Sequence, residues 1–464
     1  MSLMPAVFEG PLRVAVIGCG ERGRRAYGAY ALAYPGRLRV VACAESDPEK
    51  RDRFALEHGL EADDAHADWR VLFANPRPAF EGVIIATPDR EHVEPTVAAL
   101  EHGRDVLLEK PIAPTLDGVL AVRDAARRSS GSVTVSHVLR YTPFFSTLHR
   151  LVGEGAIGDL VGIDHSENIG YWHFAHSYVR GNWRNEAMAS PMLLAKACHD
   201  LDLLRWFAGA RCLRVHSAGG LRHFRAENVP SGAPARCLDG CPHADTCPFY
   251  APRFYIERLA LTDGPPVSAI SLDTSPEGRE RALRDGPYGR CVYRCDNDVA
   301  DHQVATLEFA NGVTASLTVS AFTPDNTRTI KLMGTRGELR GRLDTGEIEL
   351  RRFLPAPGTA PVADWGRDAE GRTALAGDIV EQVTAVPPDD PLGADDASGS
   401  FVGHDGGDGG LISAFVAHAL ARRSGETRGT ALTSLAEATE SHLIAFAAER
   451  SRREGRVIEL QPTP

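Results

Sequence analysis

The chain places two of its four lysines where an enzyme that moves a proton to or from an alcohol would need an amine. Lys110 follows an apolar run in Leu-Leu-Glu-Lys-Pro, and Lys196 lies three residues before His199. The other 47 of the 51 basic residues are arginine. A guanidinium stays protonated in proteins, whereas a partly buried ammonium changes its pKa readily. Lysine at these positions therefore indicates acid–base chemistry together with His199. The alternative is that the two lysines remain by chance in an arginine-rich chain.

A glycine-rich loop suggests what the alcohol would react with. Gly18, Gly20 and Gly23 form the pattern Gly-x-Gly-x-x-Gly directly after the apolar run 12–17 and open a helix-like stretch. Such glycines permit a tight turn and a close approach of the backbone to a pyrophosphate. Glu45 ends the next strand-like run, where a carboxylate accepts hydrogen bonds from the adenosine ribose and repels a 2′-phosphate. The pattern predicts NAD, without excluding NADP; a glycine turn that binds nothing is the structural alternative.

Two later strand ends carry polar residues as well. The segment 86–92, which holds Thr87, Pro88 and His92, follows one apolar run, and Glu109 and Lys110 follow the next. Open α/β sheets bind ligands at the carboxyl ends of their strands, so these segments are expected to meet the same cofactor. Arg140, after the fifth run, is expected to border the cofactor or link the domains. The predicted cofactor-binding residues are Gly18, Gly20, Glu21, Arg22, Gly23, Glu45, Thr87, Pro88, His92, Glu109, Lys110 and Arg140.

These motifs need a parallel sheet to hold them. Five strand-like runs alternate with helix-like sequence, which is typical of a doubly wound α/β domain. We assign this Rossmann-type, dinucleotide-binding domain to residues 1–140. The runs cover residues 12–17, 37–44, 83–86, 105–108 and 133–138.

The pattern changes after about residue 140. Alternating or apolar runs, one pair joined by the hairpin signal Asn311-Gly312, predict an α+β domain with a mainly antiparallel open sheet, and a helix over 191–207 should pack on it. We assign residues 141–375 to this second, substrate-binding domain, and 376–464 to a loop and C-terminal helices that pack on the preceding domains. The predicted strands are 160–168, 300–309, 313–322, 329–333 and 348–353; the helices are 410–423 and 431–450.

Aromatic and hydrogen-bonding residues gather just before the 191–207 helix. Sugar pockets need flat faces for C–H surfaces and polar groups for hydroxyls, which favours this segment as the substrate wall. An aromatic-rich loop at a domain interface is an equally weighted interpretation. The predicted substrate-binding residues are Tyr171, Trp172, His176, Trp183, Arg184 and His199.

Five of the nine cysteines fall in an insertion over 220–298. Cys237, Cys241 and Cys247 form a first group, and Cys291 and Cys295 form a second, which begins 44 residues after Cys247. Thiolates from two loops could hold a structural metal, most simply zinc, with an iron–sulfur cluster less favoured; unliganded thiols and a disulfide are the alternatives. A second unusual segment is the Pro, Asp and Gly-rich loop 385–409, whose His404 and Asp408 either fold back over the pocket or lie in a solvated loop.

Charge and composition exclude some functions. The net charge of −11 and the pI near 5.9 argue against binding to nucleic acid or to an acidic membrane, and no stretch approaches the roughly 20 apolar residues that span a bilayer. The first ten residues show no export signal, so we expect a cytoplasmic protein whose cysteines stay reduced. The expected partner is a small molecule.

Taken together, these motifs resemble the Gfo/Idh/MocA family of oxidoreductases. The resemblance rests on the glycine loop, Ala86-Thr87-Pro88 with His92, Glu109-Lys110-Pro111 and the helix with His199-Asp200-Leu201-Asp202, and it covers nearly all of residues 11–355. It implies reversible oxidation of a secondary alcohol on a sugar, sugar acid or cyclitol, and a homodimer or homotetramer formed through the open sheet. It also implies that Lys110 touches both the nicotinamide ribose and the substrate hydroxyl, and that His199 accepts the proton.

One position departs from the family pattern. Many relatives carry an aspartate four residues before the histidine, where this chain has Ala195, and Lys196 is expected to take over part of the substrate orientation. Two other functions stay open at this point. One is a redox-neutral enzyme that keeps NAD bound and oxidises its substrate transiently, for epimerisation, elimination or glycoside cleavage. The other is a non-catalytic regulator of a sugar pathway.

Overall fold

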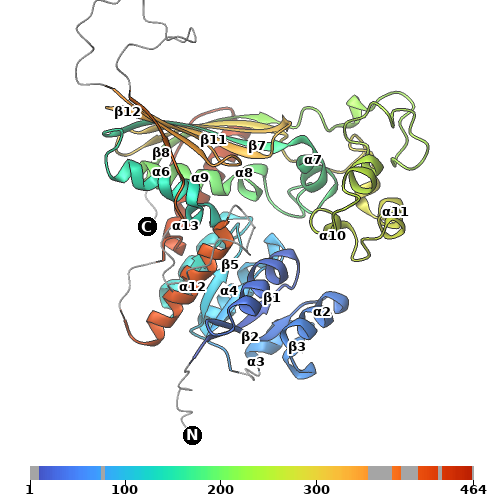
Figure 1. The fold of residues 1–464 in the computed structure, drawn as a ribbon, viewed down its shortest axis with the longest axis horizontal. Coiled ribbons are helices and arrows are strands. Elements are labelled where there is room, and N and C mark those ends of the chain that lie inside the picture. Colours follow the sequence, from blue (N-terminus) through green and yellow to red (C-terminus); the bar gives the residue numbers. More distant parts are fainter. Residues whose placement is uncertain (1–9, 75–78, 354–378, 388–405, 427–430, 462–464) are drawn as a thin grey trace, which may run out of the picture. The chain divides into compact units, whose positions relative to one another are not determined.

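The computed structural model describes residues 10–74, 79–353, 379–387, 406–426 and 431–461. The chain forms two compact units (Figure 1). Residues Met1–Pro143 and Pro387–His442 make up the first unit, and Phe144–Val386 and Leu443–Pro464 the second. No helix in the described ranges is long and apolar enough to cross a membrane.

The first unit is built on a parallel sheet of six strands in the order β3-β2-β1-β4-β5-β6. Its central strands are almost wholly buried because helices cover both faces, which explains their continuous apolar runs. The strand order reverses between β1 and β4, and ligands bind at such switch points. The strands are β1 (Leu12–Ile17), β2 (Leu38–Ala44), β3 (Ala65–His66), β4 (Gly82–Ile85), β5 (Asp105–Leu108) and β6 (Val133–Val135).

The helices of the first unit follow from local sequence signals. Asp47 precedes α2 and accepts hydrogen bonds from the backbone N–H groups of Glu49 and Lys50 at 3.0 and 3.2 Å, and Gly59 ends the helix in the left-handed conformation. The helical segments are η1 (Glu21–Gly28), α1 (Ala29–Ala33), α2 (Pro48–His58), η2 (Ala62–Asp64), α3 (Arg70–Ala74), η3 (Asp89–Glu91), α4 (Val93–Glu101), α5 (Leu116–Arg128), η4 (Val138–Tyr141) and α12 (Gly407–Arg423); α13 (Leu435–Glu454) begins in this unit.

The second unit is an open sheet of nine strands in the order β14-β13-β12-β11-β7-β10-β9-β8-β15. β7 and β10 pair in parallel, and the other pairs are antiparallel. The strands are β7 (Leu160–Gly170), β8 (Cys212–Gly220), β9 (His302–Phe309), β10 (Thr314–Thr323), β11 (Thr327–Gly334), β12 (Gly337–Arg342), β13 (Glu347–Arg352), β14 (Ile379–Val383) and β15 (Ile458–Glu459).

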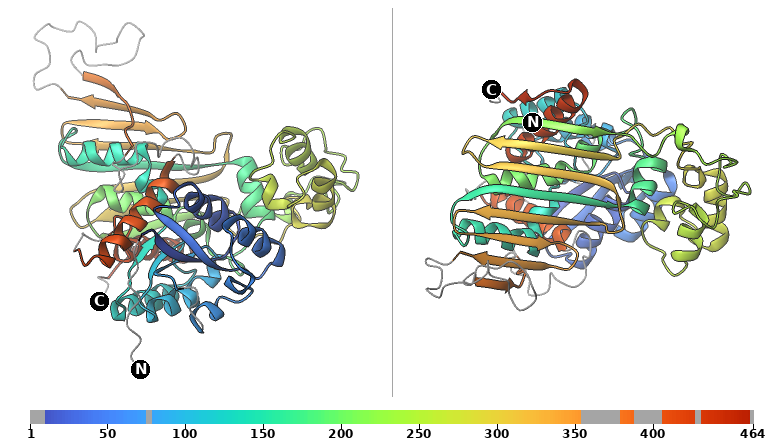
Figure 2. Two further views of the ribbon diagram at one scale, coloured as in Figure 1. Left: turned by 60° about the horizontal axis from the view of Figure 1, so that its bottom comes forward. Right: turned by 90° about the horizontal axis from the view of Figure 1, so that it is seen from above.

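Helices cover one face of this sheet and leave the other open (Figure 2). Leu307 and Leu317 point into the covered face, whereas Val304 on the open face is 43% exposed. This alternation is typical of an antiparallel sheet with one buried face. The helices of the unit are α6 (Pro143–Gly153), which begins one residue before the boundary, α7 (Tyr171–Phe174), η5 (Ala175–Arg180), α8 (Met192–Ala195) and α9 (Cys198–Ala208).

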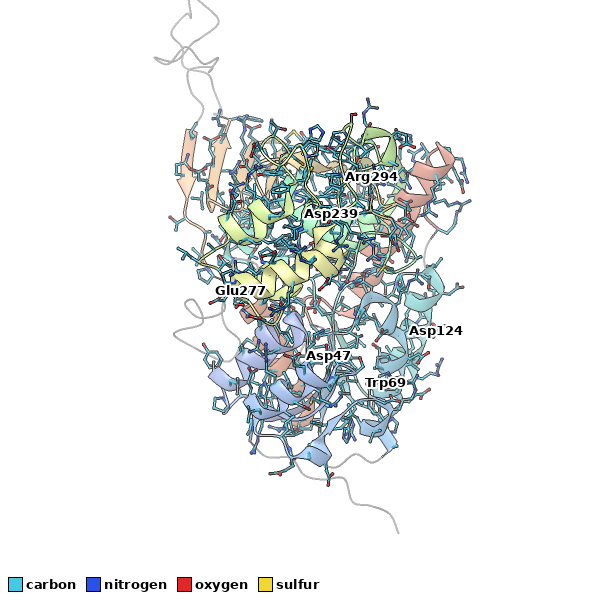
Figure 3. All side chains as sticks on the ribbon, turned by 90° about the vertical axis from the view of Figure 1, so that its right-hand side faces the viewer. Asp47, Trp69, Asp124, Asp239, Glu277 and Arg294 are labelled. Carbon is cyan, nitrogen blue, oxygen red and sulfur yellow. The ribbon has the colours of Figure 1, made fainter. Side chains whose placement is uncertain are left out.

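The insertion between β8 and β9 folds as short helices around a small core. Tyr255 and Leu283 are fully buried in it, and Ala251 and Cys237 complete its centre. Asp239, Glu277 and Arg294, labelled in Figure 3, lie on its outer surface. Its helical segments are η6 (Ala226–Asn228), η7 (Arg253–Arg258), α10 (Val267–Ile270), α11 (Pro276–Asp285) and η8 (Pro287–Gly289).

The predicted fold class is confirmed, with local differences. The single helix expected over 191–207 is two short helices, because the backbone leaves helical geometry at Ala197, where ψ is 11°. Strands β3, β8, β12, β14 and β15 are not among the predicted strands. β3 and β15 are only two residues long, β12 reads Gly-Glu-Leu-Arg-Gly-Arg and carries no apolar run, and β14 lies in the segment assigned to a loop and helices. The hairpin at Asn311-Gly312 is present, with Gly312 at φ 85°. His404 and most of the predicted loop 385–409 lie outside the described residues.

Candidate active site

The glycine loop at the end of β1 has the shape of a dinucleotide cradle. A Cβ on Gly23 would lie 1.9 Å from the carbonyl oxygen of Gly18, and a Cβ on Gly18 would lie 2.6 Å from the backbone of Ala86. These two glycines are therefore required by close packing inside the unit. A Cβ on Gly20, by contrast, would meet nothing within 4 Å. Open space over the second glycine is what a pyrophosphate needs to approach the backbone.

Glu45 lies beside this loop, as its position at the end of β2 predicts. One carboxylate oxygen accepts a hydrogen bond from the backbone N–H of Cys19 at 2.8 Å, and the other accepts one from that of Asp47 at 3.0 Å. The side chain is only half-buried. Each carboxylate oxygen has two lone pairs, so Glu45 keeps capacity to accept further hydrogen bonds while it fixes the loop.

Glu21 and Arg22, the two loop residues before Gly23, have different environments. Glu21 is exposed and pairs with Arg25 one turn later, at 3.2 Å. Arg22 points into the unit and donates to Glu109 at 2.5 Å and to both oxygens of Asp408 at 2.8 Å. Asp408, in the first turn of α12, is buried, and nothing in its local sequence predicts a partner in the glycine loop.

Glu109 connects the end of β5 to the glycine loop. It accepts hydrogen bonds from Arg22 and from the Tyr27 hydroxyl, both at 2.5 Å, and from the backbone N–H of Lys110 at 3.1 Å. Burial alone would raise the pKa of Glu109, but the charge of Arg22 and the hydrogen bonds from Tyr27 and Arg22 together outweigh this effect and hold the pKa below its ordinary value. Lys110 is half-buried and is joined to Pro111 by a cis peptide bond.

His92 lies inside this edge of the sheet. Its ring nitrogens lie 2.6 Å from the carbonyl oxygen of Pro111 and 2.9 Å from that of Thr87, and the ring is buried. It therefore ties together the loops that follow β4 and β5. Thr87 and Pro88 are more accessible, and the Thr87 hydroxyl donates to the carbonyl of Glu91 at 3.3 Å. The position of His92 gives it a structural role, while its contact with a cofactor stays a prediction.

Arg140, another of the predicted cofactor residues, is as deeply buried as His92, with 1% of its surface exposed. It donates to the carbonyl of Leu432 at 3.0 Å and lies 3.4 Å from Glu437. Both partners belong to the returning C-terminal segment of the same unit. Arg140 thus links that segment to η4.

The second unit holds His199 in the first turn of α9. The ring is buried, with 5% of its surface exposed. The next residue, Asp200, receives hydrogen bonds from Arg328 and His165, both at 2.8 Å. Although burial would raise the pKa of Asp200, the charge of Arg328 and the bond from His165 hold it well below its ordinary range. This pairing ties the start of α9 to strands β7 and β11.

Lys196 takes part in the same buried set of charges. Its ammonium lies 3.4 Å from Glu167, and the second oxygen of Glu167 pairs with Arg328. Loss of solvation, followed by the charge of Lys196, lowers the pKa of His173 to about 3. A carboxylate therefore does accompany this helix, but it comes from β7 and not from position 195. Sequence reasoning missed Glu167, whose signal was an acidic residue on the buried face of a strand.

The predicted substrate wall packs on the insertion. Tyr171 accepts a hydrogen bond from Arg258 at 3.0 Å, and the Trp172 ring lies 5.5 Å from that of Phe254. His176 is buried with its Nδ1 2.6 Å from the hydroxyl of Tyr255, a residue of the insertion. Desolvation, followed by the charge of Arg180, lowers the pKa of His176 to about 4, so its imidazole is neutral near pH 7.

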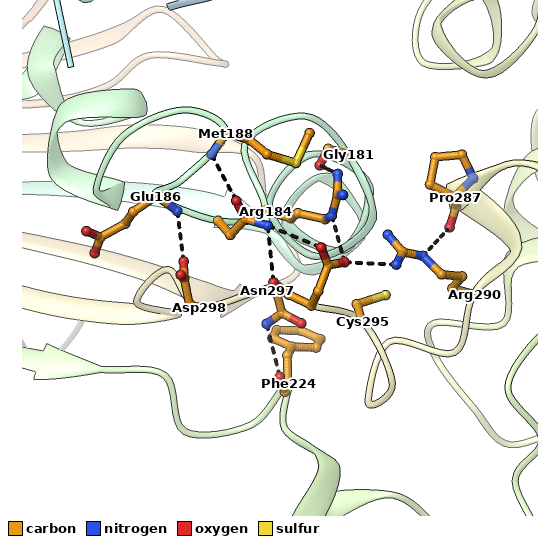
Figure 4. A network of polar contacts seen from close by, with 12 residues as sticks. Gly181, Arg184, Glu186, Met188, Phe224, Pro287, Arg290, Cys295, Asn297 and Asp298 are labelled. Atoms are coloured by element: carbon orange, nitrogen blue, oxygen red, sulfur yellow. Dashed lines mark hydrogen bonds and ion pairs between the residues drawn. The ribbon is translucent and has the colours of Figure 1, made fainter. Parts of the chain in front are cut away.

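Trp183 and Arg184 lie in the loop that follows η5. Arg184 and Arg290 both donate to Asp296 at 2.8 Å, which joins this loop to the end of the insertion (Figure 4). The Trp183 ring is half-buried and lies 6.2 Å from that of Tyr178. The prediction that these residues touch substrate remains a prediction; their contacts within the chain resemble those of an interface loop.

Four of the five insertion cysteines line one small cavity: Cys237, Cys241, Cys247 and Cys291. The fifth, Cys295, donates to the carbonyl of Cys291 at 3.4 Å and does not line it. As the side chains stand, no three His, Cys, Asp or Glu residues in the described ranges form a metal-ligating group.

Comparison with known proteins agrees with these two architectures. Residues 12–137 match the NAD-binding Rossmann fold of the Gfo/Idh/MocA oxidoreductase family, and residues 149–353 match its C-terminal alpha/beta domain. The chain is 29% identical to levoglucosan dehydrogenase of Pseudarthrobacter phenanthrenivorans over 71% of its length and 73% of that protein. It is 27% identical to inositol 2-dehydrogenase of Corynebacterium glutamicum, over 44% of its length and 56% of that protein.

A solved structure has the same fold. Levoglucosan dehydrogenase in complex with NADH and levoglucosan superposes with a TM-score of 0.65. The sequences are 20% identical, and the match covers 98% of this chain and all of the other.

Proposed function

The chain belongs to the Gfo/Idh/MocA oxidoreductase family, and from that premise we propose that it is a nicotinamide-dependent dehydrogenase of a sugar, a sugar acid or an inositol-like polyol. The observation that carries the proposal is the glycine loop. Backbone atoms pack against Gly18 and Gly23, whereas the space beside Gly20 is empty. This arrangement fits a bound dinucleotide. The relatives named for levoglucosan and inositol support a polyhydroxylated substrate.

NAD is the proposed cofactor. The carboxylate of Glu45 lies at the end of β2, where it can accept from the ribose hydroxyls and would repel a 2′-phosphate. Arg51 is directed to the main chain, since it donates to the carbonyl of Glu45 at 2.8 Å. Bound NAD would accept a hydride from the carbon that carries the alcohol.

The chain's own residues would hold and deprotonate that alcohol. We assign Lys110 to a hydrogen bond with the reacting hydroxyl and His199 to removal of its proton. Lys196, held by Glu167, would orient a neighbouring hydroxyl. Because Arg328 and His165 anchor Asp200, the first turn of α9 that carries His199 is fixed in place.

A second copy of the chain is the proposed partner. The open face of the second unit's sheet exposes Val304, and Phe322 on the same face is 46% exposed. Exposed apolar side chains on a broad sheet face favour association, so we expect a homodimer or homotetramer. Light scattering on the purified chain would measure it, and a monomer at micromolar concentration would contradict it.

The test is reduction of NAD and of NADP by the purified chain across inositols, aldoses and sugar acids. Lys110→Met and His199→Asn should each lower kcat about 100-fold or more with the active substrate. Matched controls are Lys331→Met and His216→Asn, which lie on strands β11 and β8. Dinucleotide bound tightly, with no reduction by any alcohol, would overturn the dehydrogenase in favour of a redox-neutral enzyme or a regulator.

A further inference from the structure

The insertion between β8 and β9 brings four cysteines from two distant segments to one cavity of about 20 Å³. Cys237, Cys241 and Cys247 come from its first segment, and Cys291 from its last. A space of this size is close to that of one water molecule. It can therefore hold one small ion among the four cysteines.

The backbone holds the two segments together independently of the thiols. The N–H of Cys237 donates to the carbonyl of Gly289, and the N–H of Cys291 donates to that of Ala235, both at 2.9 Å. Arg236 and Arg290 form an antiparallel bridge between them. The positions of the two cysteines are thus set by the fold and do not depend on a bond between their side chains.

A buried cation faces the thiols. Arg180, at the end of η5, is 3% exposed. Its guanidinium donates to the carbonyls of Arg290 and Phe249 at 2.8 Å and lies 3.7 Å from the sulfur of Cys237. Within the described ranges it pairs with no carboxylate. An unbalanced buried charge is costly, so an anionic group is needed at this place.

Cysteines that bind a divalent ion would supply that charge, because zinc binds cysteine as the thiolate and takes the place of the thiol protons.

We propose that Cys237, Cys241, Cys247 and Cys291 bind one structural zinc ion, with Arg180 as the counter-charge beside the sulfurs. On binding, four S–H bonds break, four Zn–S bonds form and four protons pass to solvent, with no change of oxidation state. The sulfurs must turn inward from their present positions, which do not form a ligand set. Cys295 is not a ligand, since its thiol is directed to the carbonyl of Cys291.

The ion would stabilise the surface on which η5 packs. The insertion has a small core of its own, and such folds commonly need a metal or disulfides. Its Tyr255 contacts His176 of η5, and Arg180 of η5 contacts Cys237. Metal in the insertion would therefore fix the segment that precedes the substrate-binding helices of the same unit.

The experiment measures metal in the full-length chain, expressed with added zinc. We expect one zinc per wild-type chain. Cys247→Ser and Cys291→Ser should each hold less than about a tenth of that content, and the matched control Cys295→Ser should hold as much zinc as the wild type. Arg180→Gln should weaken zinc affinity about tenfold, as loss of an outer-shell partner does.

Cobalt titration of the wild-type chain after zinc removal keeps the proposal testable if the serine variants fail to fold. Tetrahedral thiolate coordination gives intense visible and near-ultraviolet absorption, which we expect at one equivalent. No zinc and no cobalt spectrum would overturn the proposal. So would iron with sulfide, or an intact mass that shows hydrogens lost to disulfide bonds.

Discussion

Gly20→Ala should separate cofactor binding from stability. The residue has φ −75° and ψ −161°, which alanine adopts without strain, and its added Cβ would meet no atom of the chain within 4 Å. The free energy of unfolding should therefore change by no more than about 0.5 kcal/mol. If the pyrophosphate lies against this glycine, the methyl group occupies its place. We expect NAD affinity to fall at least tenfold, which is about 1.4 kcal/mol.

The assay is isothermal titration of NAD together with urea unfolding of the same preparations. Gly36→Ala is the matched control, because its Cβ also meets nothing within 4 Å and it lies outside the loop. Both variants should unfold like the wild type, and only Gly20→Ala should bind NAD weakly. Wild-type NAD affinity in Gly20→Ala would refute the placement of the pyrophosphate over this loop.

Three further predictions concern stability. Gly23→Ala should cost about 3 kcal/mol in urea unfolding, because its Cβ would overlap the carbonyl of Gly18; a cost below 1 kcal/mol would contradict that packing. Asp408→Asn should lower the free energy of unfolding by about 1–2 kcal/mol, since the ion pair of Asp408 with Arg22 is only partly buried. An unchanged unfolding midpoint would show that this ion pair does not stabilise the fold. His176 has a pKa of about 4 in the folded chain, so it takes up a proton more easily in the unfolded chain. Its protonation should therefore lower the free energy of unfolding by about 2 kcal/mol between pH 7 and pH 5. The variant His176→Gln should show a weaker pH dependence of that free energy over the same range.

Local signals explain how much of the fold could be predicted. The apolar run of β1 and the glycines after it specify a strand and a tight turn, and both are where the sequence puts them. Period-two alternation likewise marks β10. Strand β12 could not be predicted, because its glycines and arginines show no alternation of apolar and polar residues. It is a strand because it pairs with β11 and β13.

Long-range partners explain what could not be predicted. Arg22 was expected to meet the cofactor, but its charge is shared with Asp408, 386 residues away. Glu167 brings a carboxylate to Lys196 from another element, which no spacing along the helix can reveal. His92 is of the right type at the right strand end, yet its ring is directed to backbone carbonyls.

The most direct test of the account follows the hydride itself. With the most active alcohol from the panel, deuterated at the carbon to be oxidised, mass spectrometry of the cofactor after turnover measures the transferred isotope. The account predicts one deuterium in each NADH formed by the wild type. In Lys110→Met it predicts the loss of both the NADH and the deuterium that it carries. Turnover with the deuterium retained in the product or exchanged into water, and with no accumulation of NADH, would contradict a dehydrogenase.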